Sequence, residues 1–249
     1  MNSRSARRQW NFFAPGRPTN KQIMPRTYVI GDIHGCHASL LELLQRIQPD
    51  LSRDTIIFLG DYIDRGPDSK KVVSEVIRLM EAAPGRVIPL MGNHEQIFLA
   101  SLAGEERDFY LRMGGDKTLE SYGIMPPFTG RIAARIPVSH LHFFNELLLY
   151  WEDNDYIYVH AGLQPHVHLS QQSPRWCCWA REQFLDSRYD FGKRVIFGHT
   201  PFDTPFIDKN KIGIDTGAVY GGHLTCLVLP DFEFVSVAGL RIADCGLGI

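Results

Sequence analysis

Short apolar runs alternate with segments of helical periodicity through the first hundred residues. The runs at 27–30, 55–59 and 86–90 have the length of β-strands. Between them, apolar side chains recur every three or four residues at 40–47 and 72–80, which predicts two amphipathic helices. A strand, a crossover helix and a parallel strand form one unit, so this half of the chain is expected to fold as β-α-β-α-β.

Each of these three strands is followed by a polar turn that contains glycine. The turns read GDIHG at 31–35, GDYIDRG at 60–66 and GNHE at 92–95. In a parallel sheet the carboxyl ends of the strands lie along one edge, so the turns are expected to meet there. They bring together Asp, His, Asn and Arg side chains, the combination that a metal site with acid–base chemistry requires.

The second half of the chain is predicted to contain both helices and strands. Helical patterns occur at 94–102, 109–122, 139–145 and 175–184. Strand patterns occur at 147–152, 156–160, 194–197, 206–207, 211–214, 224–229 and 232–237.

Two strands of this second half also end in a polar group. The strand at 156–160 runs into HAG at 160–162, and the strand at 194–197 runs into GHT at 198–200. One histidine at a strand end is commonly structural. Five strand ends that each carry a ligand-type residue are difficult to explain as unrelated turns, so we interpret them as parts of one site.

Composition and charge agree with a globular enzyme and narrow the choice of partners. Of the 249 residues, 44% are hydrophobic and 22% are charged, and the net charge is −2. This charge gives no overall field that would attract nucleic acid or a membrane surface. No run approaches the roughly 18 apolar residues of a membrane span. We therefore expect neither nucleic acid nor a membrane as a partner.

The five cysteines indicate a reducing compartment. Their number is odd, they lack paired C-x-x-C spacing, and the adjacent Cys177 and Cys178 are poorly placed to bridge each other. The others are Cys36, Cys226 and Cys245. We expect reduced thiols in a cytoplasmic protein.

Residues 1–25 differ in composition from the rest of the chain. The segment is basic, no acidic residue occurs before Asp32, and Pro15 and Pro18 follow its aromatic residues and end that apolar stretch. We predict a flexible or loosely docked basic extension without a signal peptide. A start of translation at Met24 and a transit peptide are alternative interpretations.

The ordered series GDIHG, GDYIDRG, GNHE, HAG and GHT resembles the phosphoprotein phosphatase (PPP) family of metallophosphoesterases, especially its small bacterial and phage members. The resemblance extends over about 27–237. It implies an α/β fold in which a mixed β-sandwich is flanked by α-helices and two metal ions lie at the sheet edge. On this basis, residues 26–249 form a single metallophosphoesterase catalytic domain behind the extension at 1–25.

The resemblance also implies a ligand set for two divalent metal ions. Asp32 and His34 would complete one site, Asn93, His160 and His199 would complete the other, and Asp61 would bridge the two. All six residues offer oxygen or nitrogen and none offers sulfur. Such a set favours an open catalytic site over a closed thiolate zinc site. We expect manganese, with iron or zinc as alternatives.

Five further residues resemble the catalytic and substrate-binding residues of the family. His94 corresponds to the general acid that protonates the leaving oxygen, and Asp64 would hydrogen-bond its imidazole and favour the charged form. Arg65 and Arg181 correspond to the arginines that hold phosphoryl oxygens, and Tyr220 is expected to line the pocket.

Three other polar residues receive structural interpretations. Glu95 is expected to stabilise a helix N-terminus through its charge and not to act in catalysis. His166 and His168 have the spacing of a metal pair, but they lie in a loop rich in Pro, Gln and Ser, so we expect them to be exposed.

The expected reaction is hydrolysis of a phosphomonoester. The resemblance implies in-line attack by a hydroxide that bridges the two metals, without a phosphoenzyme. A serine/threonine protein phosphatase, acting on a phosphorylated protein or a small phosphoester, is the favoured interpretation.

The alternative is a diadenosine polyphosphate hydrolase of the same fold, a branch that often replaces the acid corresponding to Asp64. The Asp64-Arg65-Gly66 sequence is intact here and the accessory segment is small, so the sequence favours the phosphatase. A catalytically inactive phosphate-binding scaffold is a third hypothesis. It is disfavoured because all six ligands and His94 are present.

Overall fold

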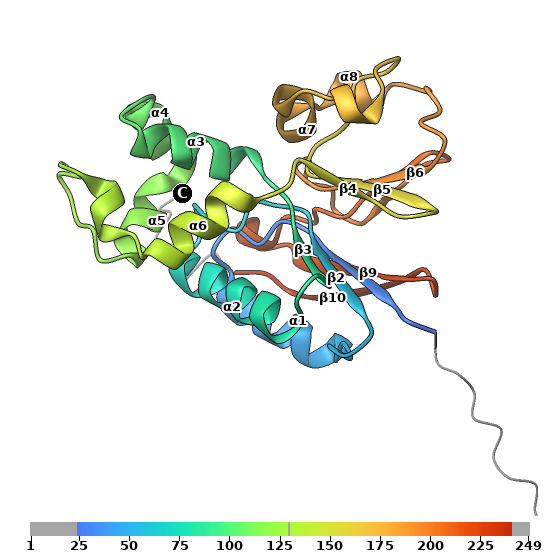
Figure 1. Cartoon of the computed structure of the whole chain (residues 1–249), viewed down its shortest axis with the longest axis horizontal. Coiled ribbons are helices and arrows are strands. Elements are labelled where there is room, and N and C mark those ends of the chain that lie inside the picture. Colours follow the sequence, from blue (N-terminus) through green and yellow to red (C-terminus); the bar gives the residue numbers. More distant parts are fainter. Residues whose placement is uncertain (1–23, 129, 241–249) are drawn as a thin grey trace, which may run out of the picture.

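The computed structural model describes residues 24–128 and 130–240 and contains two five-stranded sheets packed face to face (Figure 1). The strand order is β10-β9-β1-β2-β3 in the first sheet and β4-β5-β6-β8-β7 in the second. The predicted α/β sandwich is confirmed. The predicted basic extension, 1–25, lies outside the described residues except for Met24 and Pro25.

Six of the strands run parallel and direct their carboxyl ends to one edge of the sandwich. They are β1 to β3 in the first sheet and β5, β6 and β8 in the second. The first sheet consists of β1 (Thr27–Ile30), β2 (Thr55–Phe58), β3 (Val87–Pro89), β9 (His223–Leu229) and β10 (Glu233–Ala238). The second consists of β4 (Tyr150–Glu152), β5 (Tyr156–Val159), β6 (Arg194–Phe197), β7 (Phe206–Ile207) and β8 (Lys211–Gly213).

The parallel strands are buried on both faces, which explains why their apolar runs are continuous. Val29 and Ile57 of the first sheet point into a core between the sheets, where they pack with Tyr158 and Ile196 of the second. The neighbouring Ile30 points to the opposite face, into a core that the first sheet shares with helices.

Helices cover both outer faces of the sandwich (Figure 1). On the first sheet, α1 (His37–Ile47) and α2 (Ser69–Ala82) bury the predicted periodic positions, among them Leu40 and Val72. On the second sheet lie α7 (Pro174–Trp179) and α8 (Glu182–Leu185). The remaining helices are α3 (Asn93–Leu102), α4 (Arg107–Tyr110), α5 (Asp116–Ser121) and α6 (Val138–Glu146). No helix within the described ranges is long and apolar enough to cross a membrane.

Two predicted helices are interrupted, each for a local reason. The stretch expected at 109–122 divides into α4, a π-helical turn at Leu111–Gly115 and α5, because Gly114 adopts a left-handed φ of 93°. The helix expected at 175–184 divides at Ala180, whose ψ of 141° is extended. The other predicted helices and strands are present, with ends shifted by three residues or fewer.

One buried carboxylate joins the turn after β2 to the start of α3. Glu95 Oε2 accepts hydrogen bonds from the backbone N–H groups of Asp61 (3.0 Å) and Gly92 (3.1 Å). Its Oε1 accepts from Tyr62 (2.9 Å) and Ile63 (3.4 Å). Glu95 therefore stabilises not only the helix N-terminus, as predicted, but also the turn that carries Asp61.

We predict that Glu95→Gln destabilises the fold. The amide nitrogen cannot accept hydrogen bonds, so two of the four N–H groups lose their acceptor, at a cost of about 1–3 kcal/mol for each. Denaturant unfolding of the metal-free protein measures this loss. Glu42→Gln, at an exposed position of α1, is the matched control and should change the free energy of unfolding by less than about 0.5 kcal/mol. A loss no larger than that of the control would contradict the structural role of Glu95.

Candidate metal centre

The six predicted metal ligands converge at the carboxyl edge of the sandwich. All six are buried. The loop after β1 carries Asp32 and His34, and the loop after β2 carries Asp61. Asn93 is the first residue of α3, which follows β3, and the loops after β5 and β6 carry His160 and His199. Hydrogen bonds cross from one sheet to the other at this edge. His160 Nδ1 lies 2.8 Å from the Leu59 carbonyl, and the His199 N–H donates to Asp32 Oδ2 at 3.0 Å.

The two carboxylate oxygens of Asp61 face different imidazoles. Oδ2 lies 3.3 Å from His34 Nε2, and Oδ1 lies 3.5 Å from His160 Nε2. Asp61 thereby belongs to two groups of possible ligand atoms, one with His34 and His94 and one with His160 and His199. Within each group the atoms lie within 4.8 Å of one another. This arrangement is the one expected of a bridging carboxylate.

The protonation of the imidazoles makes the centre suitable for cations. A carbonyl oxygen can only accept, so the contacts of His34 with Ile63 O (2.8 Å) and of His160 with Leu59 O place the proton on Nδ1. The Nε2 lone pairs then face the oxygens of Asp61. His160 Nε2 also lies 3.0 Å from Asn93 Oδ1. A cation between these buried acceptors would stabilise them. At His34 Nε2 the guanidinium of Arg65 takes that position in this structure.

Electrostatics support the same conclusion. Burial lowers the pKa of His34 and His160, which keeps both rings neutral, and it lowers the pKa of His199 to about 2. The Nε2 atom of His199 is buried and has no hydrogen-bond partner. Burial, followed by the charges of Asp215 and Asp61, raises the pKa of Asp32. Divalent cations would satisfy the orphaned nitrogen and offset the crowded carboxylates, so the residues fit a metal centre.

A sixth strand end contributes Asp215, which the sequence analysis did not select. Asp215 follows β8, is buried, and accepts a hydrogen bond from the Gly217 N–H at 3.0 Å. Burial raises its pKa to about 6. The signal for this residue was available, because the predicted strand at 211–214 runs directly into Asp-Thr-Gly, like the other strand ends.

His94 and Asp64 form the predicted hydrogen-bonded pair. His94 Nδ1 lies 2.7 Å from Asp64 Oδ2, and both side chains are fully buried. The other oxygen of Asp64 accepts hydrogen bonds from Tyr110 of α4 (2.9 Å) and Thr118 of α5 (2.6 Å). The sequence patterns did not connect these two helices with the site. The Nε2 atom of His94 is buried without a partner and remains available for proton transfer.

The predicted substrate-binding residues lie at different distances from the metal ligands. Arg65 Nη1 donates to His34 Nε2 at 2.6 Å, and its guanidinium lies 5.4 Å from the centre of the Tyr220 ring. A guanidinium and a metal ion compete for the same lone pair, so metal binding at His34 requires Arg65 to move away. Tyr220 is 56% exposed at the rim, and Arg181 is exposed at the start of α8.

Backbone strain is concentrated in the same turns. Five site residues have a left-handed φ between 45° and 71°, a region that non-glycine residues rarely adopt; they are His34, Asp61, Asp64, Arg65 and His199. Gly92 in the third turn allows close approach, because a Cβ there would collide with Asp61 Oδ1 and its backbone N. The glycines of the motifs thus reflect tight packing around the ligands.

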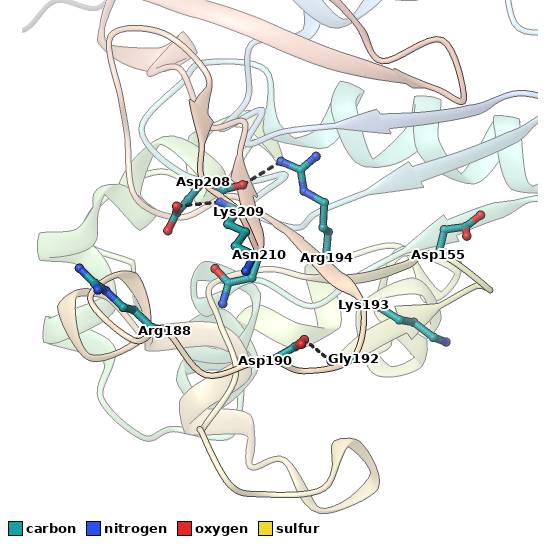
Figure 2. Close-up of a pocket in the computed structure, with 9 residues that line it drawn as sticks. All are labelled: Asp155, Arg188, Asp190, Gly192, Lys193, Arg194, Asp208, Lys209 and Asn210. Carbon is teal, nitrogen blue, oxygen red and sulfur yellow. Dashed lines mark hydrogen bonds between the residues drawn. The ribbon is translucent and has the colours of Figure 1, made fainter.

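Another cavity, of about 700 Å³, lies at the opposite edge of the second sheet (Figure 2). Its lining includes Asp155, Arg194 and Asn210, which stand at or immediately before the starts of β5, β6 and β8. None of the predicted site residues lines it. His166 and His168 are exposed, as expected from their loop.

Known proteins resemble this chain in sequence and in fold. The family model described as calcineurin-like phosphoesterase matches residues 25–203. Bis(5'-nucleosyl)-tetraphosphatase PrpE [asymmetrical] of Oceanobacillus iheyensis is 30% identical over 241 residues, covering 84% of this chain and 91% of that protein. Serine/threonine-protein phosphatase 1 of Salmonella typhimurium is 29% identical over 208 residues, covering 80% and 89%.

Among solved structures, that of a candidate diadenosine tetraphosphatase superimposes with a TM-score of 0.68 at 24% identity, covering 88% of this chain and 96% of the other. This likeness confirms the fold. The family model matches most of the chain, and the ligand turns lie in the order and geometry described above. The chain therefore belongs to the calcineurin-like phosphoesterase family, as a metallophosphoesterase of the phosphoprotein phosphatase type.

Proposed function

We propose that this protein hydrolyses bis(5'-nucleosyl) polyphosphates. The observation that carries the proposal is the similarity to a relative named as a bis(5'-nucleosyl)-tetraphosphatase, which covers 91% of the length of that relative. Further relatives of that name match with similar coverage. The intact Asp64-Arg65-Gly66 turn favours a protein phosphatase, which remains the second candidate and has a named relative of its own.

Calcineurin-like phosphoesterases use a dinuclear divalent metal centre, and the residues around Asp61 fit that use. Asp32, His34, Asp61, Asn93, His160 and His199 would hold the two ions. Such ions lower the pKa of a water molecule and offset the charge on phosphoryl oxygens. We propose manganese, with iron or zinc as alternatives, because the ligands are oxygen and nitrogen.

The protein's own residues would then hold the phosphate chain and move one proton. Arg65 and Arg181 bind phosphoryl oxygens from two sides of the ligand cluster. Asp64 holds His94 through Nδ1, so Nε2 is directed to the leaving oxygen. Cleavage of a polyphosphate releases a phosphate oxygen of low pKa, whereas cleavage of phosphothreonine releases an alkoxide. The first reaction therefore depends less on the proton from His94.

The first experiment compares two substrates with the metal-stripped protein reconstituted with Mn²⁺. We expect kcat/KM for diadenosine tetraphosphate to exceed that for a phosphothreonine peptide by at least about tenfold, a difference of roughly 1.4 kcal/mol in transition-state binding. Chelator should abolish both activities. Preference for the peptide would replace the proposed substrate and leave the metal centre unchanged.

Asp61→Asn should remove both metal ions together. An amide cannot supply two anionic oxygens to two ions, so we expect the bound metal to fall from two ions to less than about one ion per chain. Equilibrium dialysis with metal analysis measures the stoichiometry. Asp68→Asn, at the start of α2, is the control and should retain both ions. Loss of a single ion from Asp61→Asn would argue against bridging.

His94→Asn should affect the two substrates unequally. Removal of a general acid costs about 10²–10⁴ in kcat where the leaving group needs a proton, so we expect a loss of that size for the phosphothreonine peptide. For the dinucleotide we expect a smaller loss, and metal content should stay at two. The control is His142→Asn, which is exposed on α6. Equal losses on both substrates would remove the leaving-group argument.

A further inference from the structure

A cavity of about 730 Å³ lies beside the metal centre, on the side of His199. Its lining includes Trp176, Trp179, Gln96, Gln164, Gln183 and Arg175. Trp179 forms the wall shared with the metal centre, because its ring lies 6.4 Å from the imidazole of His199, centre to centre, in an edge-to-face arrangement. Trp179 therefore connects the lining of this cavity with the predicted ligand His199.

The two tryptophans form a half-buried aromatic wall. They are three residues apart on α7, so they project from the same side of the helix. Trp179 Nε1 donates to Gln96 Oε1 at 2.9 Å, which fixes the orientation of the indole. Gln96 belongs to α3, the helix that also carries Asn93 and His94. The aromatic wall is thus attached to the same element as the site residues.

Polar groups of one kind surround this wall. The side chains of Gln96, Gln164 and Gln183 each offer an amide donor and an amide acceptor. The loop that carries Gln164 is held in place by Gln172, whose Oε1 accepts from the Gln164 N–H at 2.7 Å and whose Nε2 donates to the Gln164 carbonyl at 3.0 Å. Amide groups that offer both a donor and an acceptor can form hydrogen bonds with the edge of a heteroaromatic ring.

The charge at the cavity favours an anion. Arg175 lines it, and Arg181 directly follows the lining residue Ala180. No acidic residue occurs among the described residues that line the cavity. Arg181 is also near enough to His160 and His199 to influence both electrostatically. Positive charge therefore extends from the cavity to the metal centre.

We propose that this cavity binds a nucleoside end of the substrate, with the base against Trp176 and Trp179. The glutamine amides contact the edge of the base, and the phosphate chain runs past Arg181 to the metal ligands. Aromatic side chains stack on bases with little regard to base identity, and hydrogen bonds to the base edge add selectivity. The inference rests on the proposed function, since it names the part of the protein that recognises the dinucleotide.

The test compares diadenosine tetraphosphate with tripolyphosphate, which has the same type of bond and no base. We expect Trp176→Ala to lower the ratio of the two kcat/KM values about tenfold, as the loss of one stacking partner should. Gln164→Ala should lower the ratio by a smaller factor. This second variant tests the same cavity if the tryptophan variant does not fold. Trp151→Ala, 40% exposed on β4, is the matched control and should retain the wild-type ratio. An unchanged ratio in both cavity variants would overturn the subsite while leaving the dinucleotide activity in place.

A binding measurement separates failure of the subsite from failure of the proposed function. If the wild type hydrolyses no dinucleotide, the proposed function is wrong and the subsite is judged by titration calorimetry of AMP into the Mn²⁺-loaded protein. A Kd about tenfold weaker in Trp176→Ala than in Trp151→Ala would support a nucleoside site. Absence of AMP binding, equal Kd values in the two variants, or displacement of AMP by a phosphothreonine peptide with tighter affinity would overturn it.

Discussion

The buried carboxylate of Glu95 holds the part of the molecule on which the metal centre depends. It accepts hydrogen bonds from four backbone N–H groups. Three belong to the turn at Asp61, Tyr62 and Ile63, and one belongs to Gly92. Asp61 in this turn has a left-handed φ of 51°, which costs about 1 kcal/mol or more for a residue with a side chain. Four hydrogen bonds to one carboxyl group offset that cost. The position of Asp61 is therefore fixed by a residue that lies outside the predicted ligand set.

The remaining ligands are positioned in the same way, by contacts that each join two distant segments. The backbone of His199 holds the Asp32 carboxylate, and the Leu59 carbonyl holds the His160 ring, so each sheet orients ligands of the other. Asp64 is held by Tyr110 and Thr118 from the helical segment that covers the site. The metal centre is consequently a property of the whole sandwich, and its geometry depends on how the two sheets and the helical segment pack.

The surroundings of the two halves of the centre are chemically different. On the His34 side lie the guanidinium of Arg65 and the exposed ring of Tyr220. On the His199 side lie the indole of Trp179 and a cavity with several amides. Dinuclear metal centres act on phosphoryl oxygens, which phosphoesters and phosphoanhydrides share. Substrate choice must come from these flanking regions, which differ in charge and in aromatic content.

Most of the secondary structure, and the polar side chains that gather at one sheet edge, could be predicted from the amino-acid sequence. Apolar runs and helical periodicity report burial within a few residues, so strands such as β1 and β6 were predicted with their observed bounds. Side chains of the ligand type could be located because they lie within a few residues after such strands, and parallel strands share a carboxyl edge. Their assignment to two metal sites came from the resemblance to the PPP family. Asp215 also follows a strand, β8, and could have been selected by the same criterion. The contacts between distant residues could not be predicted: Glu95 with the turn after β2, Tyr110 with Asp64, and Trp179 with His199. These contacts join residues far apart in the chain, and they depend on packing between layers, which no local pattern of apolar and polar residues encodes.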